Sequence, residues 1–329
     1  MKRFSPLARI GAAALALSAL SAAISPALAE DAYPSKPIRV IVPFTAGSAT
    51  DIIARAVGEG MRKELGQPII VENKPGAGGT LGASQVATAQ PDGYTLLVHS
   101  AGHVANSSLY PGLRYDPIKD FKSLAMLAQV PNVLVVNPKN GYKNVGDLVT
   151  KVKAAPDKFV YASAGSGSAT HMNAEKFRIA SKIAAVHVPY KGTPEAMTDV
   201  ISGNVNWFFA PITTAIPMIK EGKLQALAVG SPQRAAALPD VPTTVEAGFP
   251  GSDYDFWIGL FAPGKLPAAQ ADKITKAVSA ALKSDAVKAR FVSLGANAPS
   301  VEPAQFDAFV KNESVAAKKL ITEAKIKQD

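Results

Sequence analysis

The most constraining feature of the sequence is a repeated order of strand, small-residue loop and helix. Residues 37–44, PIRVIVPF, predict a strand, and a loop at 45–50 and a helix pattern at 51–66 follow it. A strand at 159–163, a Ser/Gly loop and a helix at 169–181 repeat this order later in the chain. Repeats of this kind indicate an α/β fold with a mainly parallel sheet.

Similar patterns fill most of the remaining chain. We expect strands at 68–72, 94–99, 132–136, 185–188, 205–210, 226–229 and 256–262, and helices at 80–89, 145–154, 193–202, 267–283, 285–294 and 303–326. Two α/β units and a helical C-terminal part indicate two lobes, one at 33–131 plus 255–329 and the other at 132–254. Two crossings between lobes form a hinge, and a cleft between such lobes is a common ligand site.

The N-terminus has the pattern of a secretory signal peptide at residues 1–29. Lys2, Arg3 and Arg9 flank the start of an apolar run, and an Ala-x-Ala sequence ends at Ala29. The run is shorter than the roughly 20 apolar residues of a spanning helix, and an uncleaved anchor is the alternative. Cleavage after Ala29 leaves 300 residues, which we expect in the periplasm.

Composition excludes several classes of protein. The chain contains no cysteine, so disulfides and a lipidated N-terminal cysteine are excluded. The net charge is +9, and removing the three basic residues of positions 1–29 leaves 32 basic and 26 acidic residues, or +6. No dense Lys/Arg run with interleaved aromatic residues accompanies this charge, which argues against nucleic-acid binding. A mild positive charge helps to attract anions.

The sequence lacks the usual catalytic motifs. None of Ser163, Ser166 and Ser168 has the two flanking glycines of a nucleophile elbow. Residues 76–82 nearly match the G-x-G-x-x-G dinucleotide motif, but the last glycine is missing. The four histidines have no recognisable zinc spacing. We therefore expect no enzyme, metal or cofactor, and a periplasmic hydrolase that uses Ser166 or Ser168 with His171 is the open alternative.

Two loops, at residues 45–51 and 163–171, end at predicted helix N-termini. Free backbone N–H groups and the positive end of the helix dipole make such points anion sites, although Ser, Thr and Asp also cap turns that bind nothing. One loop in each predicted lobe favours a site that grips a dicarboxylate at both ends. We expect Asp51 to cap its helix, and binding of a ligand amine or orientation of the loop are its alternatives. We expect His171 either to donate an N–H to a carboxylate or to be an ordinary core or surface histidine. The apolar run Trp-Phe-Phe at 207–209 is expected in the core.

Distinctive runs of residues extend along the chain from residue 33 to residue 248. They are YPSKPIR at 33–39, VPF at 42–44 with Gly47 and Asp51, GQPIIVENKPGAGG at 66–79, PDGYTLL at 91–97, HVPYKG at 187–192, GKLQALAV at 222–229 and DVPTTVEAG at 240–248. Together they resemble the Bug-type receptors of tripartite tricarboxylate transporters, and the likeness covers nearly the whole mature chain.

The resemblance implies a two-lobed periplasmic binding protein, type II-like, that closes about its hinge as a Venus flytrap. It implies a carboxylate held by the first loop and by the second lobe's Ser/Gly loop, through backbone N–H groups and ordered water. It also implies membrane subunits of the transporter as partners and no catalysis. We expect a monomer, and a sensing role for the closed form is an open alternative.

Two departures from the family pattern bear on the ligand. The family usually has two glycines in the first loop, whereas Ser48 follows Gly47 here. The family also often has an acidic residue after the apolar strand, where this chain has Phe209, Ala210 and Pro211. Without that carboxylate, the amino group of a ligand has no partner at this position, and there is room for a ligand beside the aromatic side chains of the strand. We therefore expect an aromatic dicarboxylate such as terephthalate, with citrate-like or other aliphatic carboxylates as the alternative.

The candidate ligand-binding residues lie mainly in the two loops. They are Phe44, Thr45, Ala46, Ser48, Ala49, Thr50, Asp51, Gly79, His103, Ser163, Ser166, Ser168, Ala169, Thr170, His171 and Ala210.

Overall fold

The computed structural model describes residues 33–299 and 301–327. The predicted signal peptide at residues 1–29 lies outside the described residues. The described helices and strands belong to residues Lys36–Asp329, which form one compact unit. None of the helices in this part of the chain is both long and apolar enough to cross a membrane.

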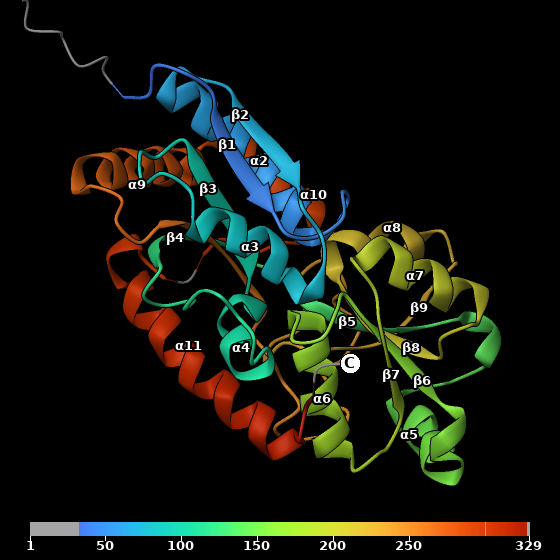
Figure 1. Ribbon diagram of the computed structural model, residues 1–329. Helices are drawn as coiled ribbons and strands as arrows, with labels where there is room; N and C mark the ends of the chain where they lie inside the picture. The colour runs from blue at the N-terminus through green and yellow to red at the C-terminus, as the bar shows by residue number, and fades with distance from the viewer. Residues whose placement is uncertain (1–32, 300, 328–329) are drawn as a thin grey trace, which may run out of the picture. The chain divides into compact units, whose positions relative to one another are not determined.

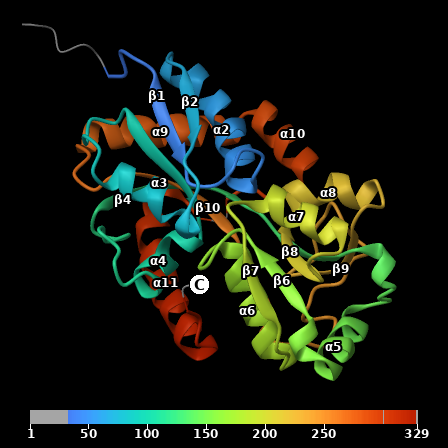
Figure 2. The same ribbon diagram turned by 45° about the vertical axis from the view of Figure 1, so that its right-hand side comes forward.

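The first of two five-stranded sheets combines N-terminal strands with one strand from the C-terminal part, β10, which Figure 2 labels (Figures 1 and 2). Its order is β2-β1-β3-β10-β4. β1 pairs in parallel with β2 and β3, and β10 runs antiparallel to β3 and β4. The strands are β1 (Ile38–Val42), β2 (Ile69–Asn73), β3 (Thr95–Ser100), β4 (Phe121–Gln129) and β10 (Trp257–Pro263).

The second sheet repeats this plan with the order β7-β6-β8-β5-β9. β6 pairs in parallel with β7 and β8, and β5 runs antiparallel to β8 and β9. The strands are β5 (Asn132–Val136), β6 (Val160–Ser163), β7 (Val186–Pro189), β8 (Trp207–Pro211) and β9 (Gln225–Val229). The chain crosses between the sheets from β4 to β5 and again before β10, so the reversed strand of each sheet directly follows a crossing. The predicted two-lobed α/β fold is confirmed, but the expected mainly parallel sheet is wrong, because two of the four strand pairs in each sheet are antiparallel. We call the first sheet with its helices the first lobe and the second sheet with its helices the second lobe.

Helices pack on both sheets (Figures 1 and 2). α2 packs against α9 and β2 in the first lobe, and α6 and α7 pack against β8 in the second. α11, the red helix in Figure 1, packs on β4 and α4 and also contacts α6 of the second lobe. The helices are α2 (Ala49–Leu65), α3 (Thr80–Ala87), α4 (Gly102–Leu109), α5 (Val145–Ala154), α6 (Ala169–Ser181), α7 (Thr193–Ser202), α8 (Ile212–Lys220), α9 (Ala268–Lys283), α10 (Asp285–Leu294) and α11 (Pro303–Ala324).

Three elements of the structure, α4, α8 and β4, were not predicted from the sequence. α8 contains Pro217, which removes one helical hydrogen bond. α4, GHVANSSL, is rich in weak helix formers, and β4, FKSLAMLAQ, lacks β-branched residues. All three elements are largely buried, so tertiary packing overrides their weak local preferences.

The aromatic run of β8 lies in the core, as predicted, with Trp207, Phe208 and Phe209 fully buried. Phe177 of α6 packs edge-on against Trp207 and Phe209, and Tyr161 of β6 stacks on Trp207 with ring centroids 4.7 Å apart. These contacts fix β6 and α6 relative to each other. They therefore fix the ends of the loop that joins them.

Candidate ligand-binding site

The loop between β1 and α2 ends in a tight turn at residues 47–50, Gly-Ser-Ala-Thr. Gly47 has φ +78°, a conformation that favours glycine. The hydroxyl of Ser48 caps α2 by accepting the N–H of Asp51 at 3.4 Å. Oδ2 of Asp51 accepts the N–H of Gly47 at 3.0 Å. Two bonds between side chain and backbone therefore close this turn.

The loop between β6 and α6 ends in the same tetrapeptide, at residues 167–170. Gly167 has φ +80°, and the hydroxyl of Ser168 accepts the N–H of His171 at 3.3 Å. Nδ1 of His171 accepts the N–H of Gly167 at 3.0 Å. The two capping serines have nearly the same backbone angles, φ −68° and ψ 159° in the first turn and φ −62° and ψ 159° in the second. We call residues 47–50 and 167–170 the first and second GSAT turns.

Several N–H groups of these loops are bonded within the loops themselves. The two turn glycines donate to the side chains described above. Ser48 and Ser168 donate their N–H groups to the carbonyl oxygens of Thr45 and Gly165, at 3.1 and 3.0 Å. These groups are therefore used in holding the turns and not in holding a ligand.

The next N–H groups in each turn are the donors that remain. Ala49 and Thr50 open α2, and Ala169 and Thr170 open α6. N–H groups at these first positions have no acceptor within their own helix, and the helix dipole makes them favourable for an anion. Each lobe therefore offers a pair of backbone donors at a helix N-terminus.

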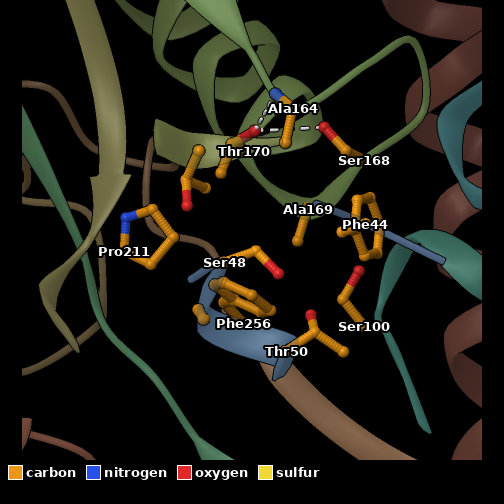
Figure 3. Close-up of a pocket in the computed structure, with 12 residues that line it drawn as sticks. Phe44, Ser48, Thr50, Ser100, Ala164, Ser168, Ala169, Thr170, Pro211 and Phe256 are labelled. Atoms are coloured by element: carbon orange, nitrogen blue, oxygen red, sulfur yellow. Dashed lines mark hydrogen bonds between the residues drawn. The ribbon is translucent and has the colours of Figure 1, made fainter. Parts of the chain in front are cut away.

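The two GSAT turns meet at a small pocket between the lobes (Figure 3). Figure 3 shows the hydroxyls of Ser48, Thr50 and Ser100 pointing into the same space, beside the rings of Phe44 and Phe256. The cavity has a volume of about 20 Å³, room for one or two water molecules. None of its twelve lining side chains is ionisable; they are Phe44, Ser48, Ala49, Thr50, Ser100, Ala164, Ser168, Ala169, Thr170, Thr193, Pro211 and Phe256.

The hydroxyl of Thr170 is engaged within the second loop. It accepts the N–H of Ala164 at 2.9 Å and lies 3.0 Å from the hydroxyl of Ser168, as the dashed lines in Figure 3 show. Thr170 is therefore placed to offer its backbone N–H to a ligand, while its side chain braces the loop.

Asp51 is buried beneath the first turn and surrounded by donors. Arg55 forms an ion pair with it at 2.9 Å, and the side-chain amide of Asn73 donates to Oδ1 at 2.9 Å. Burial alone raises the pKa of Asp51, but the bonds from Arg55, from the Gly47 N–H and from Asn73 outweigh it and hold the pKa below its usual value. The predicted capping role of Asp51 is wrong, because the N-cap of α2 is Ser48; Asp51 orients the loop instead, by accepting the Gly47 N–H from the first turn of the helix.

His171 is buried beneath the second turn, and its ring is parallel to that of His187 with centroids 3.8 Å apart. Burial, then the charges of His187 and Arg178, lower the pKa of His171 well below 6.5. Because Nδ1 accepts the Gly167 N–H, the proton of the neutral ring belongs on Nε2. Nδ1 is thus not available as a base for Ser168, whose hydroxyl caps the helix, and this arrangement argues against a hydrolase that uses Ser168 with His171.

The candidate residues fall into three groups. Those that line the pocket are Phe44, Ser48, Ala49, Thr50, Ser168, Ala169 and Thr170. Gly79 and Ser166 line a second cleft of about 520 Å³, which shares Ala164 with the first. Those that line neither space are Thr45, Ala46, Asp51, His103, Ser163, His171 and Ala210.

His103 and Ala210 lie inside their lobe cores, and a direct ligand contact is not supported for either. His103 is fully buried, its Nε2 lies 3.0 Å from the carbonyl oxygen of Pro117, and its ring packs between Phe121 and Phe261. Burial lowers its pKa to about 4. Ala210 is fully buried in β8, and the following residue of that strand reaches the pocket instead.

Sequence reasoning missed five lining residues. Ala164 lies in the second loop, between β6 and α6, but an alanine carries no polar group that would mark it as a ligand-binding residue. Ser100, Thr193 and Pro211 each lie at the end of a strand or the start of a helix, a signal that was present but shared by many other positions. Phe256 lies just before β10, at the second crossing between the lobes, and carries no local signal for a ligand site.

Direct contacts also join the two lobes around the pocket. The hydroxyl of Tyr110 donates to the carbonyl oxygen of Ser166 at 3.0 Å in a buried position. The hydroxyl of Thr45 donates to Glu195 at 3.1 Å in an exposed position. A side chain at Gly102 would lie 2.7 Å from the carbonyl oxygen of Gly167, so glycine allows this close approach.

The chain is similar to known proteins along most of its length. A family model described as tripartite tricarboxylate transporter family receptor matches residues 53–326. The chain is 38% identical over 310 residues to the UPF0065 protein in the TAR-I ttuE-ttuC' intergenic region of Agrobacterium vitis, covering 93% of this chain and 90% of that protein. It is 33% identical over 295 residues to BugT of Bordetella pertussis, covering 89% and 90%.

Solved structures are similar as well. The periplasmic binding protein BugD is 36% identical with a TM-score of 0.86, covering 90% of this chain and 100% of that one. MatC from Rhodopseudomonas palustris with bound malate is 36% identical with a TM-score of 0.83, covering 88% and 100%. A second R. palustris protein, with adipate, is 29% identical with a TM-score of 0.86, covering 90% and 100%.

Proposed function

The chain belongs to the tripartite tricarboxylate transporter family of receptors, and we propose that this solute-binding receptor takes a small dicarboxylate between its lobes. The observation that carries the proposal is the pair of GSAT turns, which bring the first residues of α2, Ala49 and Thr50, and those of α6, Ala169 and Thr170, into the lining of one pocket. Helix N-termini stabilise anions without a cationic side chain. The relatives solved with malate and with adipate hold dicarboxylates, which supports the same class of ligand here.

The lining of the pocket narrows the ligand class. Because none of the lining side chains is a carboxylate, a ligand ammonium group has no partner there, and burying it unpaired is costly. Phe44, Pro211 and Phe256 supply apolar walls for the middle of a ligand. The same lining lacks Lys and Arg, which is unfavourable for the third charge of a citrate-like acid. We therefore propose a dicarboxylate with an apolar middle and without an amino group.

The pocket in this form is too small to hold an aromatic ligand. A cavity of about 20 Å³ is far smaller than the roughly 150 Å³ of a cavity that admits benzene. We propose that residues 33–131 with 255–329, and residues 132–254, separate about the two crossings to admit the ligand. Terephthalate then requires the lobes to stay further apart than in this form, whereas a flexible aliphatic diacid requires less separation.

The family also supports a place of action and a partner. We propose that residues 1–29 direct export to the periplasm and are removed after Ala29. We also propose that the mature receptor works there as a monomer. Its proposed partner is the membrane part of a tripartite tricarboxylate transporter, which recognises the closed form. Mass spectrometry of the protein recovered from the periplasm tests the export step, with Glu30 as the expected first residue.

A ligand screen on the periplasmic protein tests the function. We expect malate, adipate or terephthalate to raise the Tm, and ligand at about 100 times its Kd to add roughly 2.7 kcal/mol to the free energy of unfolding. Aspartate, which has an amino group, and citrate, which has a third carboxylate, are the matched comparisons. Unchanged Tm values with all five acids would contradict a dicarboxylate receptor, and a larger shift with aspartate than with malate would contradict the proposed ligand class.

A further inference from the structure

His171 and Asp51 occupy equivalent positions in the two GSAT turns. Each donates its own N–H to the capping serine three residues earlier, at 3.3 and 3.4 Å, and each accepts the N–H of the turn glycine at 3.0 Å. A carboxylate and an imidazole have little in common except an acceptor atom at this point. The shared feature is therefore the hydrogen bond from the N–H of the turn glycine to this acceptor atom.

We propose that His171 is a positioning residue for ligand binding: by accepting the Gly167 N–H, it holds the second GSAT turn in the form that directs the N–H groups of Ala169 and Thr170 into the pocket. The inference rests on the proposed function, because it assigns His171 a part in holding the ligand. His171 acts through the turn, since its side chain is 3% exposed and does not line the pocket.

A second imidazole supports the same loop from the neighbouring strand. His187 of β7 stacks flat on His171, and its Nε2 lies 2.6 Å from the hydroxyl of Ser163. That hydroxyl accepts the N–H of Gly165 at 3.0 Å. Two stacked imidazoles thus hold two N–H groups of one loop, one directly and one through Ser163.

The proposed role requires Nδ1 of His171 to be unprotonated. The titratable and charged groups near the ring are His187 of β7, Tyr161 of β6, and Glu175 and Arg178 of α6. Glu175 is paired with Arg178 at 2.8 Å and bonded to the hydroxyl of Tyr161, so its charge is offset. This environment favours the neutral ring at pH 7, because burial and the Arg178 charge both disfavour the imidazolium.

Two substitutions of His171 distinguish the effect of its acceptor atom from the effect of its side-chain size. His171→Asn places an amide oxygen close to the position of Nδ1, whereas His171→Leu keeps an apolar side chain of similar size without an acceptor. We expect His171→Leu to raise the Kd for malate or adipate by about tenfold and His171→Asn by less than about threefold, measured by calorimetry at pH 7.5. Equal losses in the two variants, or no loss in His171→Leu, would overturn the proposal.

Nitrogen-15 NMR gives a readout that does not depend on any ligand. In the unliganded wild-type protein we expect the His171 proton on Nε2 and slow hydrogen exchange of the Gly167 amide. In His171→Leu we expect that exchange to accelerate by at least about tenfold, with recovery in His171→Asn. A proton on Nδ1 in the wild type overturns the positioning role even if no variant folds. If none of the five acids of the ligand screen binds the wild type, the proposed function fails, and these NMR outcomes still decide the role of His171 in the turn.

Discussion

The two GSAT turns share a sequence and a backbone conformation but differ in what supports them. In the first lobe the support is ionic, because the acceptor is Asp51 and Arg55 pairs with it at 2.9 Å. In the second lobe the support is neutral, because the acceptor is His171, which stacks on His187. The comparison teaches that this turn needs an acceptor at one point and that the charge of the acceptor is free to vary.

The difference also affects how each end of the pocket meets an anion. A carboxylate beneath a helix N-terminus reduces the attraction for an anionic ligand, and the Arg55 charge offsets this reduction. A neutral imidazole leaves the helix dipole of α6 unopposed. The ionic turn holds over a wide pH range, whereas the neutral turn depends on an unprotonated ring.

The largest expected effect comes from removing one backbone donor from each turn. Ala49→Pro and Ala169→Pro delete the N–H at the first helical position, where proline suits a helix, and the extended conformation of the preceding serine is compatible with proline. We expect each variant to raise the Kd for malate or adipate by about 30-fold, and the pair by about a thousandfold if the two ends act independently. Calorimetry measures both.

Ala268→Pro is the matched control for these prolines. Ala268 is the first residue of α9, is exposed and is absent from the pocket lining. We expect it to leave the Kd unchanged. An effect of Ala49→Pro or Ala169→Pro no larger than that of the control would show that these N–H groups do not hold the ligand.

The second effect is a loss of stability in acid. It distinguishes the ionic support of the first turn, Asp51, from the neutral support of the second turn, His171. Burial holds the folded pKa of His99, His103 and His171 below the unfolded value near 6.5, so the unfolded chain binds more protons and stability is lost as the pH falls below 6.5. For His103, with a folded pKa of about 4, the loss approaches 3 kcal/mol at pH 4. The folded pKa of Asp51 is also lowered, but its contribution is lost only below about pH 4.

Urea unfolding between pH 7.5 and 4.5 checks this prediction. We expect His171→Asn to reduce the loss of unfolding free energy between pH 6.5 and 4.5, and Asp51→Asn to leave the loss over that interval nearly unchanged. Equal pH dependence in wild type and His171→Asn would contradict the burial of a neutral His171.

A smaller effect is expected from the buried contact that reaches the second loop from the first lobe. Tyr110→Phe removes the hydrogen bond to the carbonyl oxygen of Ser166 without changing the ring, and this hydrogen bond joins the two lobes. We expect the Kd for malate or adipate to rise by about fivefold, mainly through faster dissociation, in stopped-flow measurements. An unchanged dissociation rate would show that the contact does not stabilise the closed form.

The smallest effect is expected at the exposed counterpart beside the first turn. Thr45→Val keeps the shape of the side chain and removes the bond to Glu195. Because an exposed hydrogen bond exchanges readily with water, we expect the Kd to change by less than about twofold. A larger effect than that of Tyr110→Phe would reverse the ranking of the two contacts.

Much of the site was predictable because its chemistry is local. A strand, a run of Gly, Ser and Thr, and an amphipathic helix predict a capped helix N-terminus wherever they occur, so the sequence predicts seven of the lining residues. Ser100 and Phe256 were not, because they reach the pocket from β3 and from the second crossing between the lobes. The spacing of residues along the chain does not predict that these two residues lie beside the GSAT turns.

By itself, the sequence determined the alternation of strands and helices, the two Ser/Gly loops and the family pattern, because local propensities and turn chemistry produce them. Only the tertiary structure decided which N–H groups stay available. Whether Gly47 and Gly167 face a ligand or a side chain depends on hydrogen bonds with Asp51 and His171, and those side chains are held by Arg55 and His187. The tertiary structure also decided that the two turns meet at one pocket, because packing across the crossings, and not the order of residues, brings them together.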